Sequence, residues 1–148
     1  HLVRAPEEPL NTDIQAFYMS LLNVIKTQSL REGTWQLLEC VSAWQGNGSC
    51  DDFVAHSWLG KNGERTIIVA NYAPHQSQCY LKLPFQELAG SQWMFKDMMG
   101  EDFYIRDGNN LQAAGLYLDL RPWQYHVFGI SKISEKQPTT AAAVVGLS

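Results

Sequence analysis

The sequence lacks the features that mark several large classes of protein. Its three cysteines are odd in number and show no Cys-x-x-Cys spacing, which argues against a disulfide framework or a zinc site. No apolar run approaches the roughly 18 residues that span a bilayer. The net charge of -4 disfavours nucleic acid, whose partners present a basic face. We therefore expect a reducing, cytoplasmic compartment, with neither membrane nor nucleic acid as a partner.

Signatures of enzyme active sites are also scarce. There is no Gly-x-Ser-x-Gly motif of a serine hydrolase, and the glycine loop at 46–49 lacks the lysine of a phosphate-binding loop. The histidines are scattered without metal-ligand spacing, and we expect the neighbours Asp51 and Asp52 to point apart in a solvated loop. Residues 107–110 lack most ligands of a calcium loop and predict a plain turn. We predict no metal, no cofactor and no catalytic residue.

What the sequence does contain is enough apolar residues for one folded domain. Because 45% of its 148 residues are hydrophobic and 18% are charged, the chain should form one core rather than stay disordered. The central stretch is Arg65–Leu83. Within it, the β-branched run 67–69 predicts a buried strand, and alternation of Cys79, Leu81 and Leu83 with polar residues predicts a second strand. We expect these two strands to pair as an antiparallel hairpin.

One amphipathic helix is predicted before the strands. An extended arm covers residues 1–10, and the capping-box pattern at 12–15 marks a helix N-terminus. The helix should end near Ser29. The helix carries a wide apolar stripe, which must bury against something and would be shared with another domain in a longer chain. In this chain alone it must pack on the β domain, pair with a second copy or stay partly exposed, and we expect partial exposure or self-association. The stripe consists of Ile14, Phe17, Tyr18, Leu21, Leu22 and Ile25.

Short strands separated by turns are predicted for the rest of the chain. The Asn-Gly pair at 62–63 predicts a type I′ hairpin turn, and residues 84–88 predict one helical turn. Besides the two central strands, we predict strands at 34–41, 53–59, 92–98, 103–105, 116–120 and 123–130. About eight such strands indicate a mainly β fold, namely a Greek-key-like antiparallel β-sandwich preceded by one α-helix.

The predicted organisation has three parts. Residues 1–32 form an N-terminal arm and the amphipathic helix, and residues 33–130 form the antiparallel β domain. Residues 131–148 are polar and then alanine-rich, which predicts a flexible tail or linker. Aliphatic residues of the strands should be largely buried, namely Ile67, Val69, Leu81, Leu116, Leu118 and Val127.

Tryptophan is the enriched residue type, with five in one small domain. Trp35, Trp93 and Trp123 lie in predicted strands, and we expect them in the core. Trp44 borders the glycine loop and Trp58 precedes a turn, so these two are our candidates for exposed platforms on which sugar rings stack. A coplanar pair of exposed aromatic rings would favour sugar binding, whereas burial of all five tryptophans would favour a purely structural role.

Several stretches, in this order, resemble the C-terminal part of alpha-amylase family glycoside hydrolases. Residues 1–9 resemble the segment that leads from the eighth barrel strand to the last barrel helix. Residues 17–22, of the form Phe-Tyr-x-x-Leu-Leu, resemble that helix, and residues 31–38 resemble the start of the antiparallel domain C. Residues 66–72 resemble the central strand of domain C, a hydrophobic run ending in Asn, and residues 118–128 resemble its last strand.

The resemblance covers residues 1–130 and assigns this chain to a part of such an enzyme without catalytic residues. The family's catalytic carboxylates lie on barrel loops that would precede His1, and cleavage of a glycoside needs two carboxylates across one bond. The resemblance implies an accessory domain that stabilises or positions the catalytic (β/α)8 barrel of a parent hydrolase or transferase. One alternative is a carbohydrate-binding module that holds α-glucan on exposed tryptophans, and the other is an independent enzyme.

Overall fold

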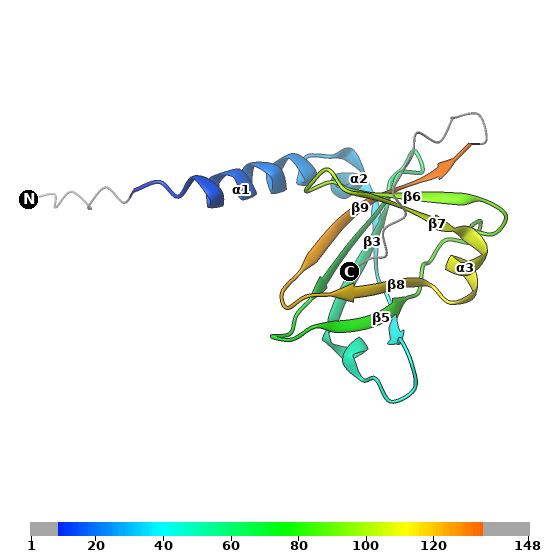
Figure 1. Cartoon of the computed structure of the whole chain (residues 1–148). Helices are drawn as coiled ribbons and strands as arrows, with labels where there is room; N and C mark the ends of the chain where they lie inside the picture. The colour runs from blue at the N-terminus through cyan, green and yellow to red at the C-terminus, as the bar shows by residue number, and fades with distance from the viewer. Residues whose placement is uncertain (1–8, 135–148) are drawn as a thin grey trace, which may run out of the picture.

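A computed structural model describes residues 9–134 of the chain (Figure 1). All strand pairs are antiparallel, and they form a six-stranded sheet in the order β1-β3-β4-β9-β6-β7 and a three-stranded sheet in the order β2-β5-β8. The predicted mainly β sandwich with an N-terminal helix is confirmed. The elements are α1 (Thr12–Ile25), α2 (Gln28–Glu32), β1 (Thr34–Leu37), β2 (Cys40–Ser42), the 3-10 helix η1 (Ser49–Asp52), β3 (Phe53–Leu59), β4 (Arg65–Asn71), β5 (Ser77–Leu81), β6 (Gln92–Asp97), β7 (Phe103–Asp107), α3 (Gly108–Ala113), β8 (Leu116–Leu120) and β9 (Tyr125–Ile133).

The predicted pairing of the two central strands is wrong. Strand β4 pairs with β3 and β9 in the large sheet, whereas β5 pairs with β2 and β8 in the small sheet. Alternation correctly indicated that each strand has one buried face, but two such faces can meet across a core as well as lie side by side. The crossing is held by Asn71, whose side-chain amide donates to the carbonyls of His75, Leu120 and Arg121 at 2.8, 3.1 and 3.0 Å.

The predicted strand at 34–41 is two strands in different sheets. The chain leaves the large sheet after β1 and enters the small sheet at β2, and Leu38 between them is buried with its amide bonded to the carbonyl of Ala55. The prediction that Trp35 and Trp123 lie in the core is wrong. Trp35 on β1 is 61% exposed, and Trp123, in the β8–β9 turn with a positive φ, is 57% exposed. Trp93 is buried as predicted, and its indole N–H donates to the carbonyl of Leu88.

Helix α1 differs from the prediction at both of its ends. The N-cap of α1 is Asn11, whose side chain accepts from the amides of Asp13 and Ile14, so the predicted capping box starts one residue late. Helix α1 ends at Ile25 rather than near Ser29, because Thr27 donates its hydroxyl to the carbonyl of Val24 and closes the last turn.

Three predicted turns also differ from the structure. Residues 107–110 are not a plain turn, because Asp107 caps α3 by accepting from the amide of Asn110. Gly63 alone has a positive φ in the β3–β4 turn, so the turn is not type I′, which needs two such residues. Residues 84–88 contain no helical turn.

The predicted tail at 131–148 lies outside the described residues except that β9 continues to Ile133, and the predicted arm lies outside them up to residue 8.

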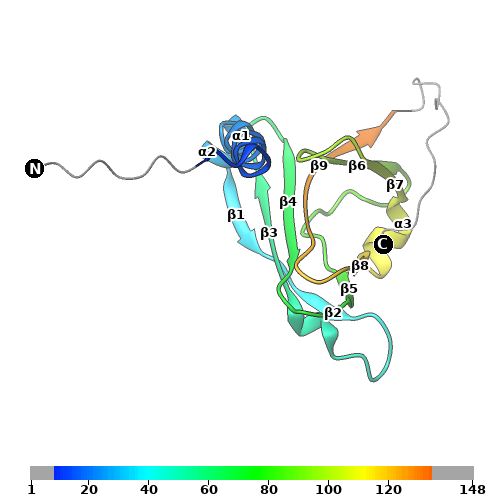
Figure 2. The same cartoon turned by 60° about the vertical axis from the view of Figure 1, so that its left-hand side comes forward.

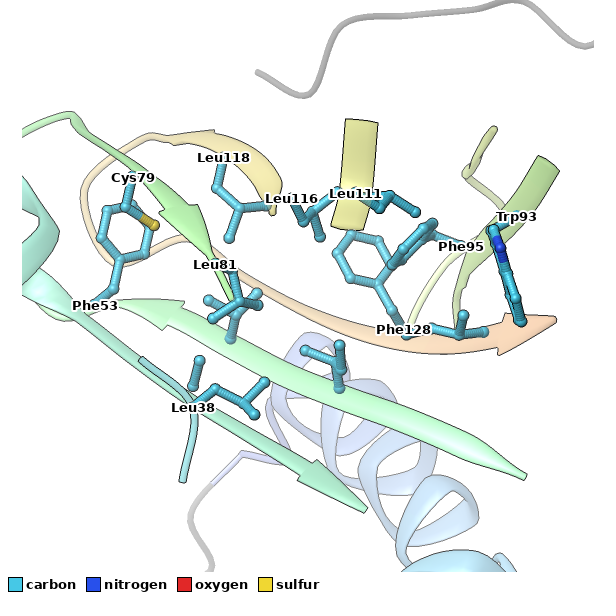
Figure 3. Packing of buried hydrophobic residues seen from close by; sticks show 14 of the residues in the cluster. Leu38, Phe53, Cys79, Leu81, Trp93, Phe95, Leu111, Leu116, Leu118 and Phe128 are labelled. Atoms are coloured by element: carbon cyan, nitrogen blue, oxygen red, sulfur yellow. The ribbon is translucent and has the colours of Figure 1, made fainter. Parts of the chain in front are cut away.

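The core lies between the two sheets and is lined by the inward faces of β3, β4, β5, β6, β8 and β9 (Figure 3). Phe95 and Phe128 meet edge to face with ring centroids 5.7 Å apart, and both are fully buried. The predicted burial of the six aliphatic strand residues is confirmed. Since each such side chain contributes roughly 1.5–3 kcal/mol, this core accounts for the stability of the sandwich.

Candidate interaction surface

The outer side of the six-stranded sheet is unusually apolar at its β1–β3 edge. Strand β3 points Phe53, Ala55 and Ser57 inward, so Val54, His56 and Trp58 point outward. In the pairing of β1 with β3, Trp35 lies opposite Trp58 and Leu37 lies opposite His56. The His56 ring contacts both indoles, with centroids 5.6 Å from Trp35 and 5.9 Å from Trp58. An aromatic ridge therefore runs across two strands where a solvent face would usually carry polar side chains.

Helix α1 lies over the same side of the sheet (Figure 2), and its apolar residues face both the sheet and solvent. Its sheet-facing side includes the buried Val24, and the ring of Phe17 contacts that of Tyr125 at the start of β9, with centroids 6.0 Å apart. Val127, which points to this outer side because Phe128 points into the core, is buried as well. The other side of the helix holds four apolar residues that are each about half exposed, namely Ile14, Tyr18, Leu22 and Ile25.

These two features together form what we call the outer apolar face. It consists of Ile14, Tyr18, Leu22 and Ile25 of α1 with Trp35, Leu37, Val54 and Trp58 of the sheet. Soluble proteins seldom leave apolar groups of this extent in water, so this face is the candidate site of an interaction. The expectation that the helix stripe stays partly exposed is confirmed for this chain.

The outer side of the three-stranded sheet has a different character. Tyr80 and Tyr117 lie opposite each other with ring centroids 5.4 Å apart. Beside them the carboxylate of Asp119 accepts from the side-chain amides of Gln76 and Gln78, at 2.8 and 3.1 Å. The side-chain amide oxygen of Gln78 in turn accepts from the side-chain amide of Asn47 at 3.1 Å. This face combines aromatic rings with hydrogen-bonded polar groups, which suits a surface in contact with water.

The two predicted sugar platforms are not brought together. Trp58 is half-buried on the outer apolar face, whereas Trp44 is exposed in the loop between β2 and η1. Within residues 9–134 no ring contact joins them. The exposed pair formed by Tyr72 and Trp123 meets at 89°, edge to face, so it offers no flat platform. Neither predicted criterion is met, because only Trp93 of the five tryptophans is buried and no exposed coplanar tryptophan pair is present in that range.

Sequence reasoning missed Trp35, Tyr80 and Tyr117 as surface residues. Each lies directly opposite another aromatic residue on the neighbouring strand, and that juxtaposition follows from strand register rather than from spacing along the chain. The available signal was the alternation in 77–81 and 116–120, which placed Tyr80 and Tyr117 on the polar side of their strands.

Three residue types of a hydrolytic triad meet at the start of β5, but not as a triad. Ser77 donates its hydroxyl to Asp52 at 2.7 Å, and Nδ1 of His75 lies 3.2 Å from that hydroxyl and 3.6 Å from the Asp52 carboxylate. A triad needs the serine on one ring nitrogen and the carboxylate on the other. Here both approach the same nitrogen, and Ser77 is fully buried, so the cluster is a structural support for the β4–β5 crossing.

A largely enclosed pair of a histidine and an aspartate lies on the inner side of the six-stranded sheet. His126 and Asp97 are joined by a 2.9 Å contact, and the His126 ring stacks on Phe128 with centroids 4.8 Å apart. Burial alone would raise the pKa of Asp97, but hydrogen bonds from His126 and from the amide of Met99 outweigh it and lower that pKa below its ordinary value. Because the pair is enclosed, it contributes to stability rather than to a binding site.

A groove of about 800 Å³ opens at the β3–β4 turn, beside the junction of α1 and α2. The guanidinium of Arg65 forms part of its wall and lies between two rings, 4.9 Å from the centroid of Phe85 and 5.0 Å from that of Trp93. Lys96 and Lys132 line the groove together with Glu64 and other residues, so its charge is mixed.

Several kinds of site are not present in the part of the chain that the structure describes. Between residues 9 and 134, no three His, Cys, Asp or Glu side chains are placed to hold a metal ion. The helices of this range are all too short or too polar to cross a membrane. No protein-family model matches the chain, and no curated protein matches it. The proposed function is therefore based on the fold and on the outer apolar face.

Proposed function

We propose that this chain is the non-catalytic C-terminal accessory β domain of an alpha-amylase-like glycoside hydrolase, and that it stabilises or positions the catalytic barrel. The main support is helix α1, which is apolar on two sides. One part of its stripe faces its own sheet, where Phe17 contacts Tyr125, and the adjoining part presents Tyr18 and Leu22 to solvent. A helix whose apolar stripe is wider than its own sheet covers belongs between two packed bodies. In the proposed parent the second body is the rest of the barrel, whose last helix α1 resembles.

The resemblance supports the same proposal. The run Phe17–Leu22 that resembles the last barrel helix lies in α1, and residues 66–72 that resemble the central strand of domain C cover most of β4. The Asn that ends this strand motif has a clear structural task here, because Asn71 ties β4 to three carbonyls around the crossing and the end of β8. The resemblance therefore rests on residues whose types the fold requires.

The test uses the parent enzyme with its barrel. We expect Tyr18→Asp to weaken the docking of barrel and β domain by roughly 2 kcal/mol, because a charge would face an apolar interface. The measured consequence is a lower midpoint of thermal inactivation with an unchanged KM. Tyr117→Asp, on the outer side of the small sheet, is the matched control and should leave that midpoint unchanged. Equal effects of the two substitutions would contradict the proposal.

In the chain separated from its barrel, we propose that the outer apolar face associates with a second copy. Two such faces can cover each other in a symmetric pair. Light scattering over a concentration series should show a molecular mass that rises above that of one chain, and Leu22→Asp should restore the single-chain mass. A single-chain mass at every concentration would contradict this association, without bearing on the docking of the barrel.

The second candidate function is a carbohydrate-binding module for α-glucan. The exposed ring of Trp44 favours it, with Trp58 as the other predicted contact residue. A few stacking contacts give affinity of roughly -4 kcal/mol, or about millimolar. Maltooligosaccharide titration monitored by tryptophan fluorescence tests it. A signal lost in Trp44→Ala or Trp58→Ala would support the candidate, and no signal at high sugar would remove it.

We also propose that the chain alone hydrolyses no glycoside. The parent is proposed to be a hydrolase or a transferase of the alpha-amylase family, and its catalytic carboxylates would lie on the barrel. The purified chain should release no reducing ends from starch above a heat-treated control. Turnover that disappears on replacing a carboxylate of this chain would contradict the proposed division of labour.

A further inference from the structure

The groove at the β3–β4 turn contains an arginine without a counter-charge. Arg65, at the start of β4, lines the groove, and its guanidinium carbon lies 4.9 Å from the ring centroid of Phe85 and 5.0 Å from that of Trp93. Such contacts hold the guanidinium in place but give its N–H groups no acceptor. The guanidinium forms no hydrogen bond or ion pair with any residue of the range 9–134. It is therefore a positioned donor that lacks an acceptor.

The guanidinium of Arg65 is enclosed at one end and open at the other. Its Nε atom is buried and has no hydrogen-bond partner. The two terminal nitrogens are not enclosed in this way, and the residue as a whole is only half-buried where it lines the groove. Donors of a partly buried charged group are costly to leave unpaired. An oxyanion that enters from the groove would supply the missing acceptor at the open end.

The charges around the groove match an anion with one negative charge. Lys96 and Lys132 line the groove with Arg65, and they are opposed by Glu64 and Glu87. Both carboxylates are exposed and form no ion pair within residues 9–134, so neither neutralises the guanidinium. Three cationic and two anionic side chains leave one positive charge in excess. A carboxylate carries that single charge and pairs with two N–H groups of a guanidinium, whereas a phosphate ester carries nearly two charges.

The groove has room for much more than a carboxylate group. Its volume of about 800 Å³ lies in the range of small-molecule sites, about 300–1,000 Å³. Met94 and Met98 line it, and Gly129 adds space because it has no side chain. Beyond its chain neighbours, a Cβ at Gly129 would meet Met98 Sδ first, at 3.6 Å. Thioether side chains adapt their shape and contact aromatic rings favourably. These walls therefore suit an aromatic body attached to the acid.

We propose that this groove binds a small organic carboxylic acid with an aromatic body, whose carboxylate accepts hydrogen bonds from the terminal N–H groups of Arg65. Lys132 adds positive charge at the same groove, and the aromatic body lies against Met94 and Met98. No residue of the outer apolar face lines the groove, so the site is independent of the proposed docking of a barrel.

Isothermal titration calorimetry of the full chain with 4-phenylbutyrate and with 4-phenylbutanol tests the need for the carboxylate, because the alcohol has the same body without the charge. We expect a Kd of about 1 mM or lower for the acid and binding at least about tenfold weaker for the alcohol. Added salt should weaken the binding of the acid. In NMR spectra, the Nε–H signal of Arg65, identified by its loss in Arg65→Met, should shift when the acid is added.

Two variants remove different parts of the site. Arg65→Met keeps an unbranched apolar stem but removes the donors, and it should lower the affinity for the acid at least about tenfold. Gly129→Val fills part of the groove while Arg65 stays in place, and the φ of Gly129 is not positive, so the strand accepts a side chain there. It should also lower the affinity about tenfold or more. Arg121→Met, at an exposed position between β8 and β9, is the matched control and should bind the acid as the natural chain does.

The midpoint of thermal unfolding shows whether each variant is folded before its affinity is compared. Absence of binding at about 10 mM acid, equal affinity for acid and alcohol, or an unchanged affinity in Arg65→Met would overturn the proposal. Tighter binding of inorganic phosphate than of 4-phenylbutyrate would overturn it as well, because the site would then not prefer a carboxylate.

Discussion

The outer sides of the two sheets differ in what they present. On the three-stranded sheet, the polar side chains of Gln76, Gln78 and Asp119 bond to one another. On the six-stranded sheet, Trp35 and Leu37 stand in solvent beside a helix that is apolar on its far side. Both sheets have the same antiparallel pairing and share one core, so backbone geometry does not cause the difference. The difference lies in the side chains, which are largely polar and hydrogen-bonded on the small sheet and largely apolar on the large one.

The largest effect should come from the two sides of α1. Val24→Asp would bury a carboxylate between helix and sheet, and we expect it to lower the free energy of unfolding by about 3 kcal/mol or more. Tyr18→Asp, on the far side of the same helix, should change it by less than about 0.5 kcal/mol in the isolated chain. Urea unfolding measures both. Similar losses would mean that the far side is already covered in this chain.

A smaller effect should come from the point where the chain passes between the sheets. Asn71→Ala removes the donors for the carbonyls of His75, Leu120 and Arg121, and we expect a loss of about 2–3 kcal/mol in the free energy of unfolding. Asn62→Ala, in the exposed β3–β4 turn, is the matched control and should be nearly neutral. If Asn71→Ala were also neutral, the two sheets would have to be held together by apolar packing alone.

Protonation of Asp97, on the inner side of the six-stranded sheet, should destabilise the chain at low pH. The folded-state pKa of Asp97 is lowered below the ordinary value of 3.8, so its contribution to stability is present above that pH and is lost as the pH falls through the folded-state pKa. Chemical unfolding between pH 6 and pH 2 should therefore show a smaller acid loss in Asp97→Asn than in the natural chain. Identical pH profiles would exclude the pair with His126 as a source of acid sensitivity.

The smallest effect belongs to the outer side of the three-stranded sheet. Asp119→Asn keeps an acceptor for Gln76 and Gln78 but removes the charge, and we expect a change of less than about 0.5 kcal/mol in the free energy of unfolding. Thermal unfolding at low and high salt provides the measurement. A loss above about 1 kcal/mol would show that this network is a structural element rather than a solvated surface.

Sequence patterns identified most strands but not their partners. Alternation gave β3 and β8 with their observed bounds, because in each strand one side is apolar and the other largely polar. Alternation contains no information on which sheet a half-buried strand joins, so β4 and β5 were wrongly paired. The same limit applied at 34–41, where a change of sheet at Leu38 leaves the hydrophobic pattern uninterrupted.

The candidate surface was only partly predictable for a related reason. The stripe of α1 follows from helical spacing, and its partial exposure was expected. The sequence does not predict the aromatic ridge, because Trp35 and Trp58 become neighbours only through the register of β1 with β3. Trp35 was assigned to the core since a tryptophan in a strand is usually buried, yet on this edge strand all four residues are exposed. In sequence, an exposed apolar strand residue looks like a core residue.

The central claim is that the outer apolar face is covered in the parent enzyme and open in this chain. Hydroxyl-radical footprinting followed by mass spectrometry measures it directly, by comparing the oxidation rates of Tyr18 and Trp35 in the isolated chain, at a concentration where it is a single chain, and in the parent with its barrel. Tyr117, on the other sheet, is the internal reference. The account predicts that Tyr18 and Trp35 are oxidised at least several-fold more slowly in the parent while Tyr117 is unchanged. Equal rates for all three residues in both proteins would contradict it.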